Sequence, residues 1–217
     1  MSYKAVVFDL DGTLLDTLED IGDSANRVLD KRGFPTHQMD DYRYFVGDGA
    51  RELVIRSLPE NAKDSETVNA CVEEFRKDYR QNWQVKTRPY DGIREMLDAL
   101  EDRGLKMAVL SNKPHEFAVK CVETFLSDWE FEIVYGERDS VPRKPDPTGA
   151  LEITEHLKIS PTSFIYLGDT GIDMETAACV GMFPVGALWG FREKQELLDH
   201  GAKLLIKRPM DILGCLK

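Results

Sequence analysis

The sequence predicts an α/β protein, with a Rossmann-like, doubly wound parallel sheet and an inserted all-helical domain. Short apolar runs alternate with amphipathic helical patterns over most of the chain. Such alternation is typical of a parallel sheet with right-handed crossovers and helices on both faces. The alternation stops over residues 17–84, where helical patterns follow one another without a strand. Several apolar runs also end in polar side chains, which indicates a functional site at one edge of the sheet.

Six apolar runs have the length and composition of buried strands. They are residues 3–8, 105–110, 131–135, 164–167, 184–188 and 204–206. Between them, apolar residues recur at helical spacing over residues 93–100 and stop before Gly104, a favourable residue after a helix. Asp146 followed by Pro147 predicts a helix start, and the helical pattern continues to Leu157.

The sequence of the insert, residues 17–84, predicts a small helical bundle. One apolar helical face runs from Leu18 to Leu29, a second from Val68 to Tyr79, and a third, shorter helix is centred on Leu53. We therefore expect a core domain formed by residues 1–16 and 85–217, and a helical domain formed by residues 17–84. Residues 87–92 are the expected return linker.

Composition excludes several classes of partner. The chain has 217 residues, of which 42% are hydrophobic and 31% charged, and a formal net charge of −11. An acidic protein is poorly suited to nucleic acid or anionic membranes. No apolar stretch is long enough for a membrane span, and the four cysteines lie far apart, as expected for reduced thiols. We expect a cytoplasmic monomer or homodimer that acts on a small molecule.

Chemically capable side chains follow three of the predicted strands, and a fourth group lies in a loop. The carboxyl ends of parallel strands meet at one edge of a sheet, so we expect these groups to converge. They are Asp9, Asp11, Gly12 and Thr13 after the first strand, Ser111 and Asn112 after residues 105–110, Lys144 in the loop after residues 131–135, and Asp169 and Asp173 after residues 164–167.

These residue types indicate phosphoryl chemistry. Asp9 can attack phosphorus to form an aspartyl-phosphate, and Asp11 can protonate the leaving oxygen and then deprotonate a water. Lys144 can supply positive charge to the transition state. The remaining groups divide into two sets: predicted Mg²⁺ ligands, Asp9, Asp11, Asp169 and Asp173, and predicted contacts to phosphoryl oxygens, Ser111, Asn112, Gly12 and Thr13.

In this order, the four groups resemble the four motifs of the haloacid dehalogenase-like superfamily, and the resemblance covers essentially the whole chain. It implies an aspartate nucleophile at Asp9, a Mg²⁺ cofactor and a helical cap, formed by the insert, that closes over small phosphorylated metabolites. Within the superfamily, residues 45–50, 88–92 and 111–114 look most like those of phosphoglycolate phosphatases.

The insert contains one candidate for substrate recognition. Residues 46–50 form a glycine-rich turn before a predicted helix, and such a turn can bind an anion. Arg51 can pair with a substrate carboxylate, which suits phosphoglycolate, a molecule with a carboxylate at one end and a phosphate at the other. A surface salt bridge explains Arg51 equally well.

Other interpretations stay open. The same core suits a β-phosphoglucomutase-like phosphomutase or an inorganic pyrophosphatase, and a non-catalytic phosphate- or metal-binding protein can retain the fold. Single residues also have structural explanations, because Asp169 and Asp173 can cap a helix and Lys144 can be a loop lysine in solvent. Residues 189–192 follow the fifth predicted strand and can edge the site.

Overall fold

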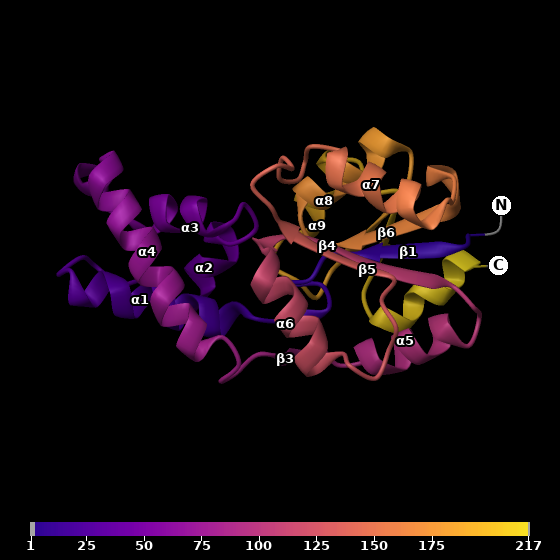
Figure 1. The fold of residues 1–217 in the computed structure, drawn as a ribbon, viewed down its shortest axis with the longest axis horizontal. Helices are drawn as coiled ribbons and strands as arrows, with labels where there is room; N and C mark the ends of the chain where they lie inside the picture. The colour runs from indigo at the N-terminus through magenta and orange to yellow at the C-terminus, as the bar shows by residue number, and fades with distance from the viewer. Residues whose placement is uncertain (1–2, 217) are drawn as a thin grey trace. The chain divides into compact units, whose positions relative to one another are not determined.

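The computed structural model describes residues 3–216, so residues 1, 2 and 217 of the predicted core domain lie outside the described part. The chain divides into two compact units (Figure 1). The core unit comprises the described parts of Met1–Leu15 and Pro89–Lys217, and the helical unit comprises Asp16–Arg88. Each unit is described by itself below, and the assignment of residues 17–84 as a cap domain stays a prediction.

The core unit is built on a six-stranded sheet in which every neighbouring pair of strands is parallel. The spatial order is β5-β4-β1-β6-β7-β8, which confirms the predicted α/β fold and all six predicted strands. The strands are β1 (Ala5–Phe8), β4 (Lys106–Pro114), β5 (Ile133–Glu137), β6 (Phe164–Gly168), β7 (Phe183–Ala187) and β8 (Leu204–Ile206).

Helices cover both faces of this sheet, with α7 and α8 on one side and α5 and α6 on the other (Figure 1). Every residue of β1 and β6 is therefore buried, and the two strands are continuous apolar runs without alternation. The helical elements of the unit are α5 (Ile93–Glu101), α6 (His115–Phe125), α7 (Thr148–Leu157), α8 (Gly171–Val180), α9 (Lys194–Asp199), η2 (Pro161–Ser163) and η3 (Pro209–Leu216).

One face of the sheet packs an apolar cluster against α7 and α8. Val7 of β1 and Phe164 of β6 contribute from the strands, and Ile153 and Ala177 contribute from the two helices; all four are fully buried. Burial of this apolar surface is the main stabilising term for the layered arrangement. The packing fixes the positions of β1 and β6 relative to α8. The polar groups that follow the two strands are held in place with them.

The strand order places a topological switch point at β1. From β1 the chain proceeds to β4 and β5 on one side, and it then returns to β6, β7 and β8 on the other side. Crossovers diverge at such a point and leave a crevice at the carboxyl ends of the strands, where ligands bind in open α/β sheets. Asp9 directly follows β1, so it lies at this point.

Strand β4 differs from its predicted end at Leu110. It continues to Pro114, with a shift in its pairing register to β5 between Leu110 and Pro114. Ser111 and Asn112 therefore belong to an irregular extension of the strand rather than to a loop after it. The apolar run ends at Leu110 because the residues that follow, at the carboxyl end of the sheet, are polar.

The helical unit contains four α-helices and one 3₁₀ turn. The sequence predicts three of the helices and misses α2, whose seven residues bury only Tyr42, too short a pattern for a helical period. The elements are α1 (Leu18–Lys31), α2 (Met39–Phe45), α3 (Ala50–Ser57), η1 (Glu60–Ala62) and α4 (Ser65–Asn82). Two short strands, β2 (Leu15–Asp16) and β3 (Arg88–Pro89), pair where the chain enters and leaves this unit.

The lengths and compositions of the helices bear on whether the chain can cross a membrane. Across residues 3–216, none of the helices has both the length and the apolar character that a bilayer span requires.

A buried carboxylate joins the two ends of the helical unit. Asp20 of α1 is 3% exposed and accepts hydrogen bonds from the backbone N–H groups of Lys86, at 3.0 Å, and Thr87, at 2.9 Å. The Thr87 hydroxyl donates to the same carboxylate at 2.8 Å. These bonds satisfy the buried donors of Thr87 and the partly buried N–H of Lys86 where the chain leaves α4, so Asp20 holds the return segment against α1.

Replacing Asp20 with alanine will destabilise the protein by about 2 to 4 kcal/mol, because it leaves the buried Thr87 N–H and the partly buried Lys86 N–H without an acceptor. Urea unfolding followed by circular dichroism measures the change. Asp30→Ala, on the same helix but exposed, is the matched control and will change stability by less than about 0.5 kcal/mol. Equal effects of the two substitutions would contradict this role for Asp20.

Candidate active site

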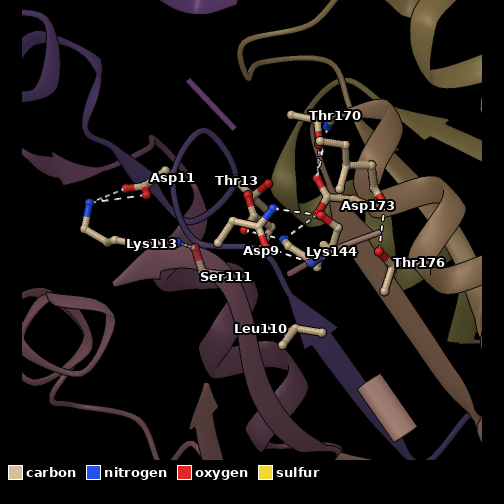
Figure 2. A network of polar contacts seen from close by, with 12 residues as sticks. Asp9, Asp11, Thr13, Leu110, Ser111, Lys113, Lys144, Thr170, Asp173 and Thr176 are labelled. Atoms are coloured by element: carbon tan, nitrogen blue, oxygen red, sulfur yellow. Dashed lines mark hydrogen bonds and ion pairs between the residues drawn. The ribbon is translucent and has the colours of Figure 1, made fainter. Parts of the chain in front are cut away.

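The polar groups predicted from the sequence meet at the carboxyl end of the sheet. Figure 2 shows Asp9, Lys144 and Asp173 pointing toward one another, with Thr13 beside them. They come from the end of β1, the loop between β5 and α7, and the first turn of α8. The structure therefore brings residues separated by more than a hundred positions into one cluster.

The Lys144 ammonium group lies at the centre of this cluster. Its Nζ atom donates to Asp9 Oδ1 at 2.8 Å and to Asp173 Oδ1 at 2.7 Å. The Lys144 side chain is 4% exposed, which excludes the interpretation of a loop lysine in solvent. A buried charge is stable only with charged or hydrogen-bonded partners, and two carboxylates supply them here.

The Asn112 side chain holds the Lys144 backbone in place. Its Nδ2 group donates to the Lys144 carbonyl at 3.1 Å, and its Oδ1 atom accepts from the Lys144 N–H at 2.9 Å. This reciprocal pair links β4 to the loop that carries the lysine. The predicted contact to a phosphoryl oxygen involves the Asn112 backbone, so it is compatible with the positioning of Lys144 by the side-chain amide.

Both oxygens of Asp169 are fixed by donors from other segments. Thr13 Oγ1 donates to Asp169 Oδ1 at 2.9 Å, and the backbone N–H of Phe191 donates to Oδ2 at 2.7 Å. The indole N–H of Trp189 in turn donates to the Thr13 carbonyl at 3.0 Å. Residues 189–192 therefore do edge the site, and their backbone orients one of its acids.

Asp173 caps α8, one of the two compatible roles that the sequence predicts for it, and it also contacts Lys144. Its Oδ2 atom accepts from the Thr170 N–H at 3.1 Å and from the Thr170 hydroxyl at 2.7 Å, in the capping box that starts α8. Its Oδ1 atom accepts from Lys144. The helix cap therefore orients Asp173 so that one oxygen faces the cluster.

Three carboxylates offer a site for a metal ion. In the part of the chain that the structure describes, the acidic group that can hold an ion consists of Asp9, Asp169 and Asp173, whose ligand atoms lie within 4.8 Å of one another. All three are buried, and carboxylate oxygens are the donors that hard cations prefer. The donor set therefore fits Mg²⁺. The Asp11 carboxylate is not part of this group, and its role as a metal ligand stays a prediction.

Burial sets the charge balance of the cluster. It raises the pKa of Asp9 well above its ordinary value; Lys144 opposes the rise, and the neighbouring acids add to it. Burial, together with the charge of Asp173, raises the pKa of Asp169 to about 7. Burial works against the charge of Lys144, but Asp173 and Asp9 outweigh it and raise the pKa of the amine. Three buried acids, two of which contact the one lysine, favour binding of a further cation.

The acids are enclosed by glycines that leave no room for a side chain. A Cβ atom on Gly190 would lie 2.2 Å from the Cβ of Asp169, and one on Gly168 would lie 2.3 Å from the Cβ of Asp173. Gly12, predicted at a phosphoryl oxygen, has φ of +89° and would place a Cβ 2.4 Å from Asp169 Oδ2. Close approach to the acids therefore explains glycine at these positions.

The remaining predicted residues lie nearby or in the other unit. Ser111 is 4% exposed, and its Oγ accepts from the Lys113 N–H at 3.2 Å. Asp11 forms an ion pair with Lys113, a residue to which the sequence analysis gives no role. Arg51 is on α3 of the helical unit, where it donates to Asn69 Oδ1 at 2.6 Å, and its role stays a prediction.

Comparison with known proteins identifies the family to which this fold and cluster belong. The model of the haloacid dehalogenase-like hydrolase family matches residues 6–187. The chain therefore belongs to the haloacid dehalogenase-like hydrolases, as its four motifs predict.

Among individual relatives, the chain is 31% identical to a phosphoglycolate phosphatase of Aquifex aeolicus, over 97% of this chain and 95% of the relative. It is 32% identical to an N-acetylmuramic acid 6-phosphate phosphatase of Pseudomonas aeruginosa, over 100% and 96% of the two chains. A crystal structure from Lactobacillus delbrueckii subsp. bulgaricus, described as a candidate phosphoglycolate phosphatase, has a TM-score of 0.93 and 30% identity over 100% and 99%.

Gly190→Ala will weaken divalent metal binding by at least about tenfold, because the new methyl group must displace Asp169. Isothermal titration with Mg²⁺ or Mn²⁺ measures the affinity. Gly214→Ala adds a methyl group where no atom lies within 4 Å and serves as the control. An unchanged affinity in Gly190→Ala would show that the orientation of Asp169 does not determine metal binding.

Proposed function

We propose that this protein is a Mg²⁺-dependent phosphatase that hydrolyses small phosphate monoesters through an aspartyl-phosphate on Asp9. The observation that carries the proposal is the contact between the Lys144 ammonium group and both Asp9 and Asp173. A lysine in this position neutralises charge beside the nucleophile, and an anionic phosphate can then approach an anionic carboxylate.

The reaction has two steps in this proposal. In the first, an oxygen of Asp9 attacks phosphorus, the bond from phosphorus to the ester oxygen breaks, and the departing oxygen takes a proton from Asp11. In the second, a water attacks the phosphorus of the aspartyl-phosphate and gives a proton to Asp11, and Asp9 is released.

The metal ion and the lysine share the task of neutralising the phosphoryl group. Asp9, Asp169 and Asp173 are the proposed ligands of Mg²⁺, which supplies Lewis acidity to a phosphoryl oxygen when bound. The Ser111 hydroxyl, the backbone of Asn112 and the turn at Gly12 and Thr13 are the proposed donors to the other oxygens. Asp9 and Asp173 hold the Lys144 amine charged near neutral pH, so it contributes without a proton transfer.

The proposed substrates carry a carboxylate as well as a phosphate monoester. Phosphoglycolate and N-acetylmuramic acid 6-phosphate, which give two of the relatives their names, share these two groups and differ in size. We propose 2-phosphoglycolate as the first substrate to test, with Arg51 of the helical unit as the partner of its carboxylate. Arg51 donates to the neutral amide of Asn69, and this contact leaves its charge available for a carboxylate.

Asp9→Asn will reduce phosphate release by at least about a thousandfold, because the amide oxygen is a poor nucleophile. A Malachite Green assay with Mg²⁺ and 2-phosphoglycolate measures the rate, and circular dichroism confirms the fold. Asp139→Asn, in an exposed position, will retain full activity. Retained activity in Asp9→Asn would overturn the mechanism.

A substrate panel separates the alternatives that the sequence left open. Release of phosphate from glycolate and sugar-acid phosphates supports the proposal. Isomerisation of a hexose phosphate without release would favour a phosphomutase, and turnover of pyrophosphate alone would favour a pyrophosphatase. Metal binding with no turnover across the panel would favour a non-catalytic protein.

Arg51→Ala will raise KM for 2-phosphoglycolate about tenfold or more and leave KM for p-nitrophenyl phosphate nearly unchanged, because only the first substrate has a carboxylate. Steady-state kinetics on both substrates measures the ratio. Arg76→Ala removes another arginine of the helical unit, which pairs with Glu73 on α4, and is the control. Equal increases on the two substrates would contradict carboxylate recognition by Arg51.

A further inference from the structure

A second buried lysine lies beside the predicted acid and base. Lys113 Nζ is 2.9 Å from Asp11 Oδ1 and 3.2 Å from Oδ2, so the ammonium group contacts both oxygens of the carboxylate. The two side chains are 3% and 12% exposed. Figure 2 shows this pair to one side of Asp9, with Lys144 and Asp173 on the other side.

The setting of Lys113 makes it a fixed rather than a mobile partner. Its backbone N–H donates to Ser111 Oγ, so the residue touches both the hydroxyl of the second motif and the acid of the first. On the adjacent strand, Gly136 packs so closely that a Cβ there would lie 2.5 Å from the Lys113 carbonyl oxygen. The backbone of Lys113 is thus held from two sides, and its side chain reaches a carboxylate 102 positions away in the sequence.

As a purely structural element, the pair of Lys113 and Asp11 would contribute little to the free energy of folding. Desolvation of two charges offsets much of their attraction, and apolar side chains of similar volume stabilise a protein as well or better. The two buried lysines divide the acids between them, since Lys144 contacts Asp9 and Asp173 while Lys113 contacts Asp11. This division places one cation at the nucleophile and another at the group that exchanges protons.

We infer that Lys113 is a positioning residue for Asp11, which it orients for proton transfer to the leaving oxygen and from the attacking water. The inference rests on the proposed function. The Asp11 side chain has two rotatable bonds that the contact with Lys113 restrains. A carboxylate that is not oriented loses much of the contribution of a general acid or base, which is about 10²- to 10⁴-fold.

The test uses two aryl phosphates that differ by a para nitro group and therefore in their need for an acid. Phenyl phosphate releases a basic phenolate, whereas p-nitrophenyl phosphate releases a weakly basic one that departs without a proton. Lys113→Met will lower kcat/KM for phenyl phosphate about 30-fold and for p-nitrophenyl phosphate less than about threefold. Because the second step still needs a base, Lys113→Met will also show a burst of p-nitrophenolate followed by slow turnover.

A double-mutant cycle separates positioning from other roles. In an Asp11→Asn background, Lys113→Met will cause less than about a twofold further loss, because its effect passes through Asp11. Lys106→Met is the matched control: it removes a lysine of the same strand that pairs with Glu132 at the surface. If Lys113→Met does not fold by circular dichroism, Lys113→Gln, which retains a donor, takes the same measurements.

The outcomes distinguish this inference from the proposed function. Equal losses on the two aryl substrates, or an undiminished loss in the Asp11→Asn background, would overturn the positioning role and assign Lys113 to substrate binding or stability. Wild-type protein that releases no phosphate from either substrate would overturn the proposed function itself, and the inference with it.

Discussion

The site depends on one buried ammonium group. Lys144 holds Asp9 and Asp173 together at hydrogen-bonding distance in a setting almost without solvent. Asp169 completes the group of three buried carboxylates. Burial and the charges of neighbouring acids raise the pKa values of Asp9 and Asp169. The cluster is therefore arranged to accept more positive charge, which is what binding a metal ion together with a phosphate requires.

The fold stabilises this cluster of buried charges because hydrogen bonds orient its acids without a ligand. A threonine hydroxyl and a backbone N–H hold Asp169, and a helix cap holds Asp173. Glycines on three different segments allow the backbone to approach these acids more closely than any side chain permits. Preorganised groups of this kind lose little free energy to reorientation during a reaction, so the order of the site is itself a contribution to the proposed catalysis.

The sequence predicted the core unit well because its signals are local. Each strand of the sheet contains a short apolar run, and each chemically capable group follows such a run or lies in the next loop. Because the carboxyl ends of parallel strands meet at one edge of a sheet, these runs predict both the parallel fold and the convergence of the groups beside β1. Helix α2 was not predicted because it buries only Tyr42 and so has no apolar helical period. The extension of β4 was not predicted because Ser111 and Asn112 are polar, and consecutive polar residues do not give the apolar pattern of a buried strand.

By itself, the sequence determined the fold class, the family and the identity of the main acids and lysine, because these depend on residue type and order along the chain. Only the tertiary structure decided which partner each of them has. The Phe191 N–H that orients Asp169 is a backbone group and leaves no trace in residue type. The contact of Lys113 with Asp11 joins residues 102 positions apart, and local patterns carry no information about pairing over such distances.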